Sequence, residues 1–454
     1  MRRLPRVAFL AALAFASGCV SVDREAAEAR AAIASGRPAD ATTWSCELAT
    51  NSFYSTRLGR VEAGRVAWLS GDFPAAEAWF RAAVDGAIDR QEGEPRLKLG
   101  DVGNAALSAT VTDDRTREYY LSPYEINLAL AYVILAQLAN GKIEDARADA
   151  RLAVYVQDTL AKTYGEDLAK SAAGGDADEK RRSASSAVVA QQTEALDAMM
   201  AATRNSWENP VLWWLTGAVL EASGETDMAE ASYRKASACR PENAVFRADV
   251  ERLEKGGAPA AASAGTARVV LVYEEGLVPQ RQSLKIPVPI YTAMSIDVPT
   301  YAEKTAWLPR RVAVSGAEKL VAATPALDVR ALAARDLSEQ MPGIVVRNIT
   351  RAAVQAGAQT AVNAAGNDYA KLAVLIVNAI ATAIRRADTR SWVTLPDGMQ
   401  VWEDGAMKPG SCQLGVEVDG RTVAVPLTLA AGDVKLVWIA DVGPNFQSAV
   451  VSLK

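Results

Sequence analysis

Three neighbouring side chains, Asp388, Arg390 and Trp392, form the sharpest polar cluster in the sequence. A carboxylate and a guanidinium here flank an aromatic ring that could stack on a sugar or a peptide, which makes the cluster a possible binding site in the C-terminal part. The alternative is structural: the two charged residues pair at a helix-to-strand junction, and the tryptophan lies in the core. Such junctions commonly use ion pairs without catalysis, so the sequence favours the structural interpretation.

Carboxylates could do acid–base chemistry or bind calcium. Glu274 and Glu275 end a predicted strand, but adjacent strand residues point to opposite faces and cannot face one substrate together. A carbohydrate- or peptidoglycan-active domain that uses Asp388 and Asp397 is a further hypothesis. The sequence shows no spaced carboxylate pair of the kind that glycoside hydrolysis needs, so this enzyme hypothesis stays second.

The chain has no histidine, which excludes Ser-His-Asp triads, Cys-His pairs and zinc sites with a histidine ligand. Cys46, Cys239 and Cys412 are widely spaced and match no metal-binding pattern. Cys46 and Cys239 are the one pair considered for a disulfide, and buried unreactive thiols are the favoured alternative. We therefore expect no catalytic residue, no metal and no cofactor.

The N-terminus has the features of a bacterial lipoprotein signal. Three arginines precede a short apolar stretch at residues 7–16, which is too short to span a bilayer, and small residues then lead directly into Cys19. This resembles a lipobox and implies cleavage after residue 18 and lipidation of Cys19. An ordinary secretory signal with an incidental cysteine is the alternative. Val20 rather than Asp follows Cys19, which favours the periplasmic face of the outer membrane.

Composition indicates an ordered, acidic protein. The chain has 454 residues, half of them hydrophobic, which is enough for two or three domains with sizeable cores. Loss of residues 1–18 removes three arginines and no acids, so the net charge falls from −5 to −8. A nucleic-acid partner is therefore not expected, because its binding would need a basic face.

The elements that must position these residues begin with a repeated helical unit. Residues 209–241 predict a helix–turn–helix of the tetratricopeptide kind, in which small residues let two helices cross closely beside large aromatic ones. Residues 57–85 repeat the spacing, and a weaker copy follows residue 123. The copies are not in tandem, so we expect an irregular array. The positions that match in the last copy are Trp213, Gly217, Leu220, Gly224, Ala229, Tyr233, Ala236 and Pro241.

A groove along the first helix of each unit is the best predicted partner site, because Trp and Arg are favoured in interfaces. The alternative is that extra helices or the C-terminal domain already cover this face. The patches from the three copies contain Leu58, Val61, Arg65, Trp68, Leu69, Leu128, Ala131, Leu135, Leu138, Val211, Trp214, Ala218 and Glu221. The residues singled out as partner-binding are Arg65, Trp68, Leu135, Trp214 and Glu221.

The predicted fold class is α+β and multidomain. The expected parts are a signal peptide at 1–18, a lipidated tether with a short helix at 19–55, a helical domain at 56–253, a linker at 254–266 and a β-rich domain at 267–454. The last is expected to be an antiparallel sheet or sandwich with an inserted helical pair punctuated by Pro342 and Gly366, an edge marked by Pro287 and Pro289, and a hairpin turn at Asp419-Gly420. Residues 88–122 and 170–186 are expected to be loops.

Residues 387–410, ADTRSWVTLPDGMQVWEDGAMKPG, resemble a family of uncharacterised Gram-negative lipoproteins with N-terminal tetratricopeptide repeats. The resemblance covers nearly the whole chain. Some members stand beside genes for lipoproteins that activate penicillin-binding proteins, which suggests cell-envelope work. The sequence thus predicts a non-enzymatic outer-membrane lipoprotein scaffold that binds an envelope protein or peptide. A peptidoglycan- or carbohydrate-binding or -active C-terminal module is the alternative, and an adaptor in surface-polymer export is not separated from the first.

Overall fold

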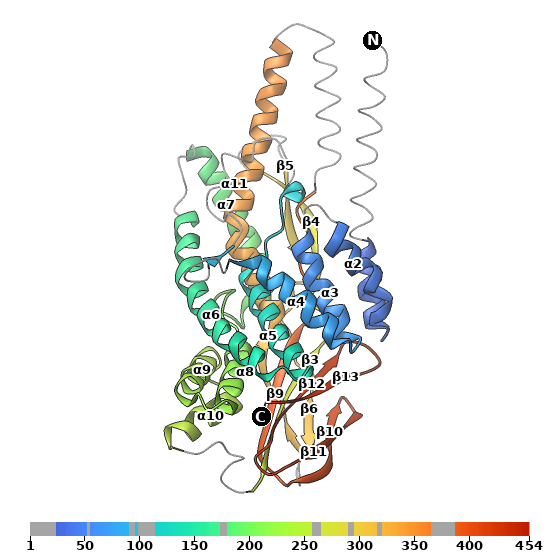
Figure 1. Ribbon diagram of the computed structural model, residues 1–454. Helices are drawn as coiled ribbons and strands as arrows, with labels where there is room; N and C mark the ends of the chain where they lie inside the picture. Colours follow the sequence, from blue (N-terminus) through green and yellow to red (C-terminus); the bar gives the residue numbers. More distant parts are fainter. Residues whose placement is uncertain are drawn as a thin grey trace.

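The computed structural model describes residues 24–51, 55–89, 96–98, 114–172, 179–256, 265–288, 295–315, 320–364 and 386–453 (Figure 1). It is an α+β protein, as predicted, with helices first and mostly antiparallel sheets in the C-terminal region. The signal peptide and Cys19 lie outside the described residues. None of the described helices combines the length and the apolarity needed to cross a bilayer.

Helices form the first part of the chain and return once in the second part. After helical residues 24–34, they are η1 (Pro38–Ala41), α2 (Thr42–Asn51), α3 (Thr56–Leu69), α4 (Phe73–Ala87), η2 (Asp114–Thr116), α5 (Pro123–Ala139), α6 (Ile143–Ala172), α7 (Glu179–Met200), α8 (Pro210–Ala222), α9 (Thr226–Cys239), α10 (Ala244–Glu254) and α11 (Val329–Ala364).

The strands lie mainly in the second part. They are β1 (Ile88–Asp89), β2 (Arg96–Leu97), β3 (Ala267–Glu275), β4 (Arg281–Pro287), β5 (Ser295–Tyr301), β6 (Val312–Ser315), β7 (Leu320–Ala322), β8 (Thr324–Asp328), β9 (Gly398–Met407), β10 (Gly410–Val418), β11 (Arg421–Leu429), β12 (Val434–Asp441) and β13 (Gln447–Ser452).

The three predicted helix–turn–helix units are present as α3–α4, α5–α6 and α8–α9. Their close crossings have the predicted cause. A Cβ on Gly64 would lie 2.6 Å from the Phe80 ring, and a Cβ on Gly217 would lie 2.7 Å from the Tyr233 ring. The glycine in each tight turn has a positive φ, which is 83° at Gly224. Whether the units belong to the tetratricopeptide class stays a prediction.

The strands form two main sheets. A five-stranded sheet has the order β13-β12-β3-β9-β8, and a four-stranded sheet has the order β11-β10-β6-β7. The expected antiparallel pairing holds except between β12 and β3, which are parallel. Asp419 and Gly420 make the predicted hairpin turn between β10 and β11, with φ of 47° and 81° as a type I′ turn requires.

The five-stranded sheet is the middle layer of the molecule. On one face of β3, Val270 and Val272 join the core of the helices. On its other face, Val269 and Leu271 join a second core that lies against the four-stranded sheet. Because successive strand residues alternate between faces, a strand buried on both faces must be apolar throughout its centre. The helical part and the β-rich part therefore share one continuous core rather than standing apart.

Three expectations about boundaries need correction. Pro342 does not end a helix, since α11 runs through it and extends away from the body at its C-terminal end (Figure 1). The expected loop at 170–186 is largely helical, because α6 continues to Ala172 and α7 begins at Glu179. The expected loop at 88–122 contains β1, β2 and η2. Gly366 and most of the linker lie outside the described residues, as does Pro289.

Candidate functional site

The five side chains predicted to bind a partner lie in the interior. None is more than 4% exposed: Arg65, Trp68, Leu135, Trp214 and Glu221. A partner could not touch them in this structure. The prediction of an open groove is therefore wrong. The structure has the alternative arrangement considered from the sequence, in which the protein itself covers this face.

The C-terminal part makes most of this cover at the first two helical units. Arg65 Nη2 donates to Glu274 Oε2 at 2.5 Å, and Arg65 Nε donates to the Thr394 carbonyl at 3.2 Å. The Tyr132 hydroxyl donates to the other oxygen of Glu274 at 2.5 Å. The Trp68 ring packs edge-on against Trp438 of β12. Strand β3 and its neighbours thus occupy the predicted groove.

The last helical unit is closed by α10 and by Arg268 of β3. Trp214 Nε1 donates to Asp249 Oδ2 at 2.9 Å. Glu221 pairs with Arg268 at 2.8 Å and with Arg252 at 2.5 Å. Burial alone would raise the pKa of Glu221, but the two guanidiniums outweigh it and lower the pKa. The charged residue predicted to face a partner instead joins the two parts of the chain.

The segment before β9 packs between the helices and forms hydrogen bonds with them. Trp392 is fully buried, and its backbone N–H donates to Glu125 Oε1 at 3.0 Å. The Val393 N–H and the Thr394 hydroxyl both donate to Glu62, at 2.7 and 2.5 Å. Burial raises the pKa of Glu62 to about 8, although these hydrogen bonds oppose the shift. The most specific motif of the sequence therefore has a structural role from Trp392 onward.

Asp388 and Arg390 form the ion pair that the structural interpretation predicted. Their Nη2 and Oδ2 atoms are 2.7 Å apart, and Nε donates to Oδ1 at 2.8 Å. The pair also contributes to a pocket, which the structural interpretation did not include. Both side chains line a pocket, whereas Trp392 lies behind it in the core.

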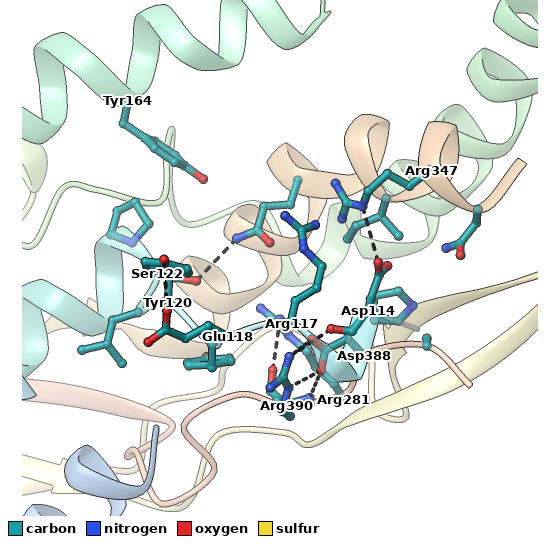
Figure 2. A pocket seen from close by; sticks show the side chains of 18 residues that line it. Asp114, Arg117, Glu118, Tyr120, Ser122, Tyr164, Arg281, Arg347, Asp388 and Arg390 are labelled. Carbon is teal, nitrogen blue, oxygen red and sulfur yellow. Dashed lines mark hydrogen bonds and ion pairs between the residues drawn. The ribbon is translucent and has the colours of Figure 1, made fainter. Parts of the chain in front are cut away.

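This pocket, of about 510 Å³, lies where the start of α5, the middle of α11 and the segment after residue 386 meet (Figure 2). The start of α5 is fixed by a capping box between Ser122 and Glu125. The charged and tyrosine side chains that line the pocket are Asp114, Arg117, Glu118, Tyr119, Tyr120, Tyr164, Arg281, Arg347, Asp388 and Arg390.

Most charges of the wall are paired. Arg281 bonds to the buried Asp336 at 3.1 Å, and Glu118 pairs with Arg57. With the Asp388–Arg390 pair, these interactions leave the wall near neutrality everywhere except around η2. Any surplus charge of the pocket must therefore come from that end.

Positive charge accumulates around Asp114. Its Oδ1 lies 2.9 Å from Arg351 and 3.7 Å from Arg347, one helical turn apart on α11. Arg117 has no carboxylate partner among the described residues, and its side chain extends into the same space as Arg347 (Figure 2). Two guanidiniums thus share one carboxylate, and a third lies near them without one. Burial lowers the pKa of Arg347, and Arg117 and Arg351 lower it further while Asp114 opposes them.

Several donors in or beside the pocket have no hydrogen-bond partner. The Nε atoms of Arg347 and Arg351 are buried and unsatisfied, as is the hydroxyl of Tyr164. Tyr164 is only 1% exposed, and Figure 2 shows its hydroxyl directed into the pocket. Buried donors without acceptors are costly, so such a group of them indicates a site for an acceptor.

Trp392, the ring considered from the sequence for stacking, is buried behind the pocket, and the aromatic rings that line the pocket are tyrosines. The Arg390 guanidinium lies over the Tyr119 ring at 5.6 Å, and that of Arg57 lies over Tyr120 at 4.5 Å. Both tyrosines thus already have a cation over the ring. Within this pocket, the cations therefore limit the ring faces that a flat sugar ring could stack on.

The other carboxylates considered from the sequence do not join the pocket. Glu274 points to the helices, whereas Glu275 accepts from Trp307 Nε1 at 2.6 Å, so the two face opposite ways as expected. Asp397 binds Arg330 with both oxygens, at 2.8 and 2.5 Å. Asp388 and Asp397 therefore do not form a pair, and the enzyme hypothesis that combined them has no common site here.

Metal and disulfide chemistry find no support within the described ranges. Those residues contain no group of three or more acidic or cysteine side chains that could hold a metal ion. Cys46, Cys239 and Cys412 are unpaired and partly buried, and burial raises the pKa of Cys239 to about 12. The disulfide considered between Cys46 and Cys239 is not formed.

Sequence reasoning missed the pocket arginines. Arg347 and Arg351 stand four residues apart, a spacing that puts two side chains on one helical face and was available as a signal. No local pattern brings Arg117 or Asp114 to that face, because both lie far from α11 in the chain and no sequence periodicity relates them to it.

No known family model, curated protein or solved structure matches this chain. The resemblance to lipoproteins with tetratricopeptide repeats therefore stays a prediction from the sequence. Function has to be argued from the pocket itself.

Proposed function

We propose that this protein is a non-enzymatic lipoprotein of the bacterial envelope that holds a partner by an anionic group seated in the arginine-lined pocket. The observation that carries the proposal is a surplus of guanidinium groups: Arg347 and Arg351 share the one carboxylate of Asp114, and Arg117 beside them has no carboxylate partner among the described residues. Two positive charges are left without a counter-ion among the described residues. An anionic group would supply it and would satisfy the open donors.

A binding role is favoured over catalysis by the state of the pocket carboxylates. Asp388 is held by Arg390, Glu118 by Arg57 and Asp114 by α11 arginines. Each of these carboxylates is thus already engaged in an ion pair, and none is presented alone to a substrate. The scaffold function inferred from the sequence is kept, but its partner site moves from the filled groove to the pocket. The helical units would serve as tetratricopeptide-like support, and Cys19 as the lipid anchor.

The test is a calorimetric titration of the mature chain, without its lipid, at low ionic strength. Inorganic phosphate and benzoate serve as two separate anionic probes. We expect at least one of them to bind saturably, and Arg117→Gln to weaken that binding tenfold or more because it removes the unpaired charge. Arg311→Gln is the matched control, since Arg311 is exposed and does not line the pocket. Absence of binding by both probes, or equal binding by Arg117→Gln, would contradict the proposal.

A further inference from the structure

The proposed function leaves open which anionic group fits the pocket, and the number of open donors bears on this. A single carboxylate carries one charge and is usually satisfied by one guanidinium fork. The pocket instead offers Arg117, which has no carboxylate partner, the Nε of Arg347, which lies 3.7 Å from Asp114 and beyond hydrogen-bond distance, and the buried hydroxyl of Tyr164, which makes no hydrogen bond of normal geometry. These come from three separate elements that converge on one space (Figure 2). Donors arranged around an acceptor suit a tetrahedral group better than a planar one.

The positive charge of the pocket also favours a tetrahedral anion. Three guanidiniums around Asp114 leave two positive charges to be balanced. A phosphate monoester carries close to two negative charges near pH 7 and has three strong acceptor oxygens. A sulfate ester has the same shape and one charge, and a carboxylate has one charge and two oxygens. Among these groups, the phosphate monoester matches both the charge and the donor count.

The volume of the pocket limits the size of the molecule that carries the anionic group. A volume of about 510 Å³ lies within the range of small-molecule sites. The apolar part of the lining consists of Leu121, Pro123, Pro299, Ile344 and Ala387. The pocket can thus enclose a phosphate with a small substituent.

We infer that the anionic group recognised by this pocket is a terminal phosphate monoester, bound as a dianion by Arg117, Arg347 and the Tyr164 hydroxyl. The inference rests on the proposed function and specifies its ligand class. A soluble molecule and a lipid head group both present a phosphate of this chemistry.

The experiment compares phenyl phosphate, phenyl sulfate and benzoate, which share a ring and differ in the anionic group. Calorimetry on the mature chain without its lipid should show phenyl phosphate binding at least tenfold more tightly than the other two. Tyr164→Phe should weaken phenyl phosphate about fivefold, because it removes one hydroxyl and keeps the buried ring. Arg117→Gln should remove most of the preference for phosphate over sulfate, since that preference comes from the second charge.

Vesicles separate the two sources. Binding to phosphatidic acid vesicles that is lost in Arg117→Gln would assign a lipid head group, and phenyl phosphate binding without vesicle binding would assign a soluble phosphate. Equal affinity for phenyl phosphate and benzoate, both sensitive to Arg117→Gln, would overturn the inference and leave the proposed function intact. No binding of any probe would overturn both.

Discussion

At the scale of residues, this protein buries charge where its two parts meet. Arg65 and Glu274 are completely buried, and the Glu274 carboxylate also accepts a hydrogen bond from the Tyr132 hydroxyl. Removing one member of such a pair commonly costs about 3–5 kcal/mol, because it leaves an uncompensated buried charge. The contacts therefore hold the C-terminal part in one orientation on the helices.

Glu62 gives the clearest dependence on pH. Burial raises its pKa to about 8, with Glu125 adding to the shift and Arg30 opposing it. The folded state then holds a proton that the unfolded state releases above its pKa near 4.5. Stability from this group is present at low pH and is lost as pH rises towards 8, by up to about 1.4 kcal/mol per pH unit.

Glu62→Gln should remove this slope, because an amide mimics the neutral acid and keeps the bonds to Val393 and Thr394. Denaturant unfolding between pH 5 and 8 checks it through the difference between wild type and variant. That difference should increasingly favour the variant as pH rises. Glu47→Gln, an exposed change, should leave the wild-type slope as it is. Parallel curves for wild type and Glu62→Gln would show that Glu62 does not carry a proton in the folded state.

The positions of some single residues were predicted correctly from the sequence, and those of others were not. The Asp388–Arg390 ion pair and the core position of Trp392 follow from their place at an element junction. The pocket that the pair lines could not be foreseen, because it needs Arg117 and Arg347, which are far apart in the chain. Arg65 and Glu221 were misplaced for a related reason: a charged residue on a helix looks exposed until its buried partner is known.

At the scale of elements, the helical hairpins are specified by small residues at their crossings. Gly217→Ala should destabilise the fold by about 1–3 kcal/mol, because its Cβ would lie 2.7 Å from the Tyr233 ring, which is fully buried. Thermal or denaturant unfolding measures the cost. Gly86→Ala in α4 is the matched control, since its Cβ would meet only arginine side chains, the flexible end of Arg60 at 3.3 Å and Arg57 at 3.7 Å. That change should be neutral or stabilising, and an equal loss in both variants would refute the crossing argument.

Helices with small residues at fixed spacing and the β10–β11 turn were predictable because each is determined within a short window. Pro342 misled because proline usually ends a helix, yet here α11 continues past it. The parallel pairing of β3 with β12 was also missed. No local pattern reports which distant strand lies beside β3, and alternation of apolar residues is the same in either direction.

At the scale of the whole molecule, the helical and β-rich parts are joined over a continuous core. The sequence suggested two separate domains because the small-residue linker at 254–266 stands between them. One signal pointed the other way: residues 123–139 are apolar on nearly every side, as expected of a helix buried all round. In the structure α5 lies between its helical neighbours and the five-stranded sheet.

The joining of the helical and β-rich parts limits which surfaces a partner could reach. The face that would form a groove in an isolated helical array is filled, and the pocket forms only because α5, α11 and the segment after residue 386 meet. We therefore propose that the seam between the two parts creates the binding site while it closes the groove.

Hydrogen–deuterium exchange on the mature chain, with and without phenyl phosphate, tests that claim most directly. Amides of α3 and α8 should exchange slowly in both conditions, because their helices are covered. The anion should slow exchange only around the pocket, in residues 114–123, 340–352 and 386–392 and in the part of α6 next to Tyr164. Rapid exchange in α3 and α8, or protection that appears there rather than around the pocket, would contradict the account.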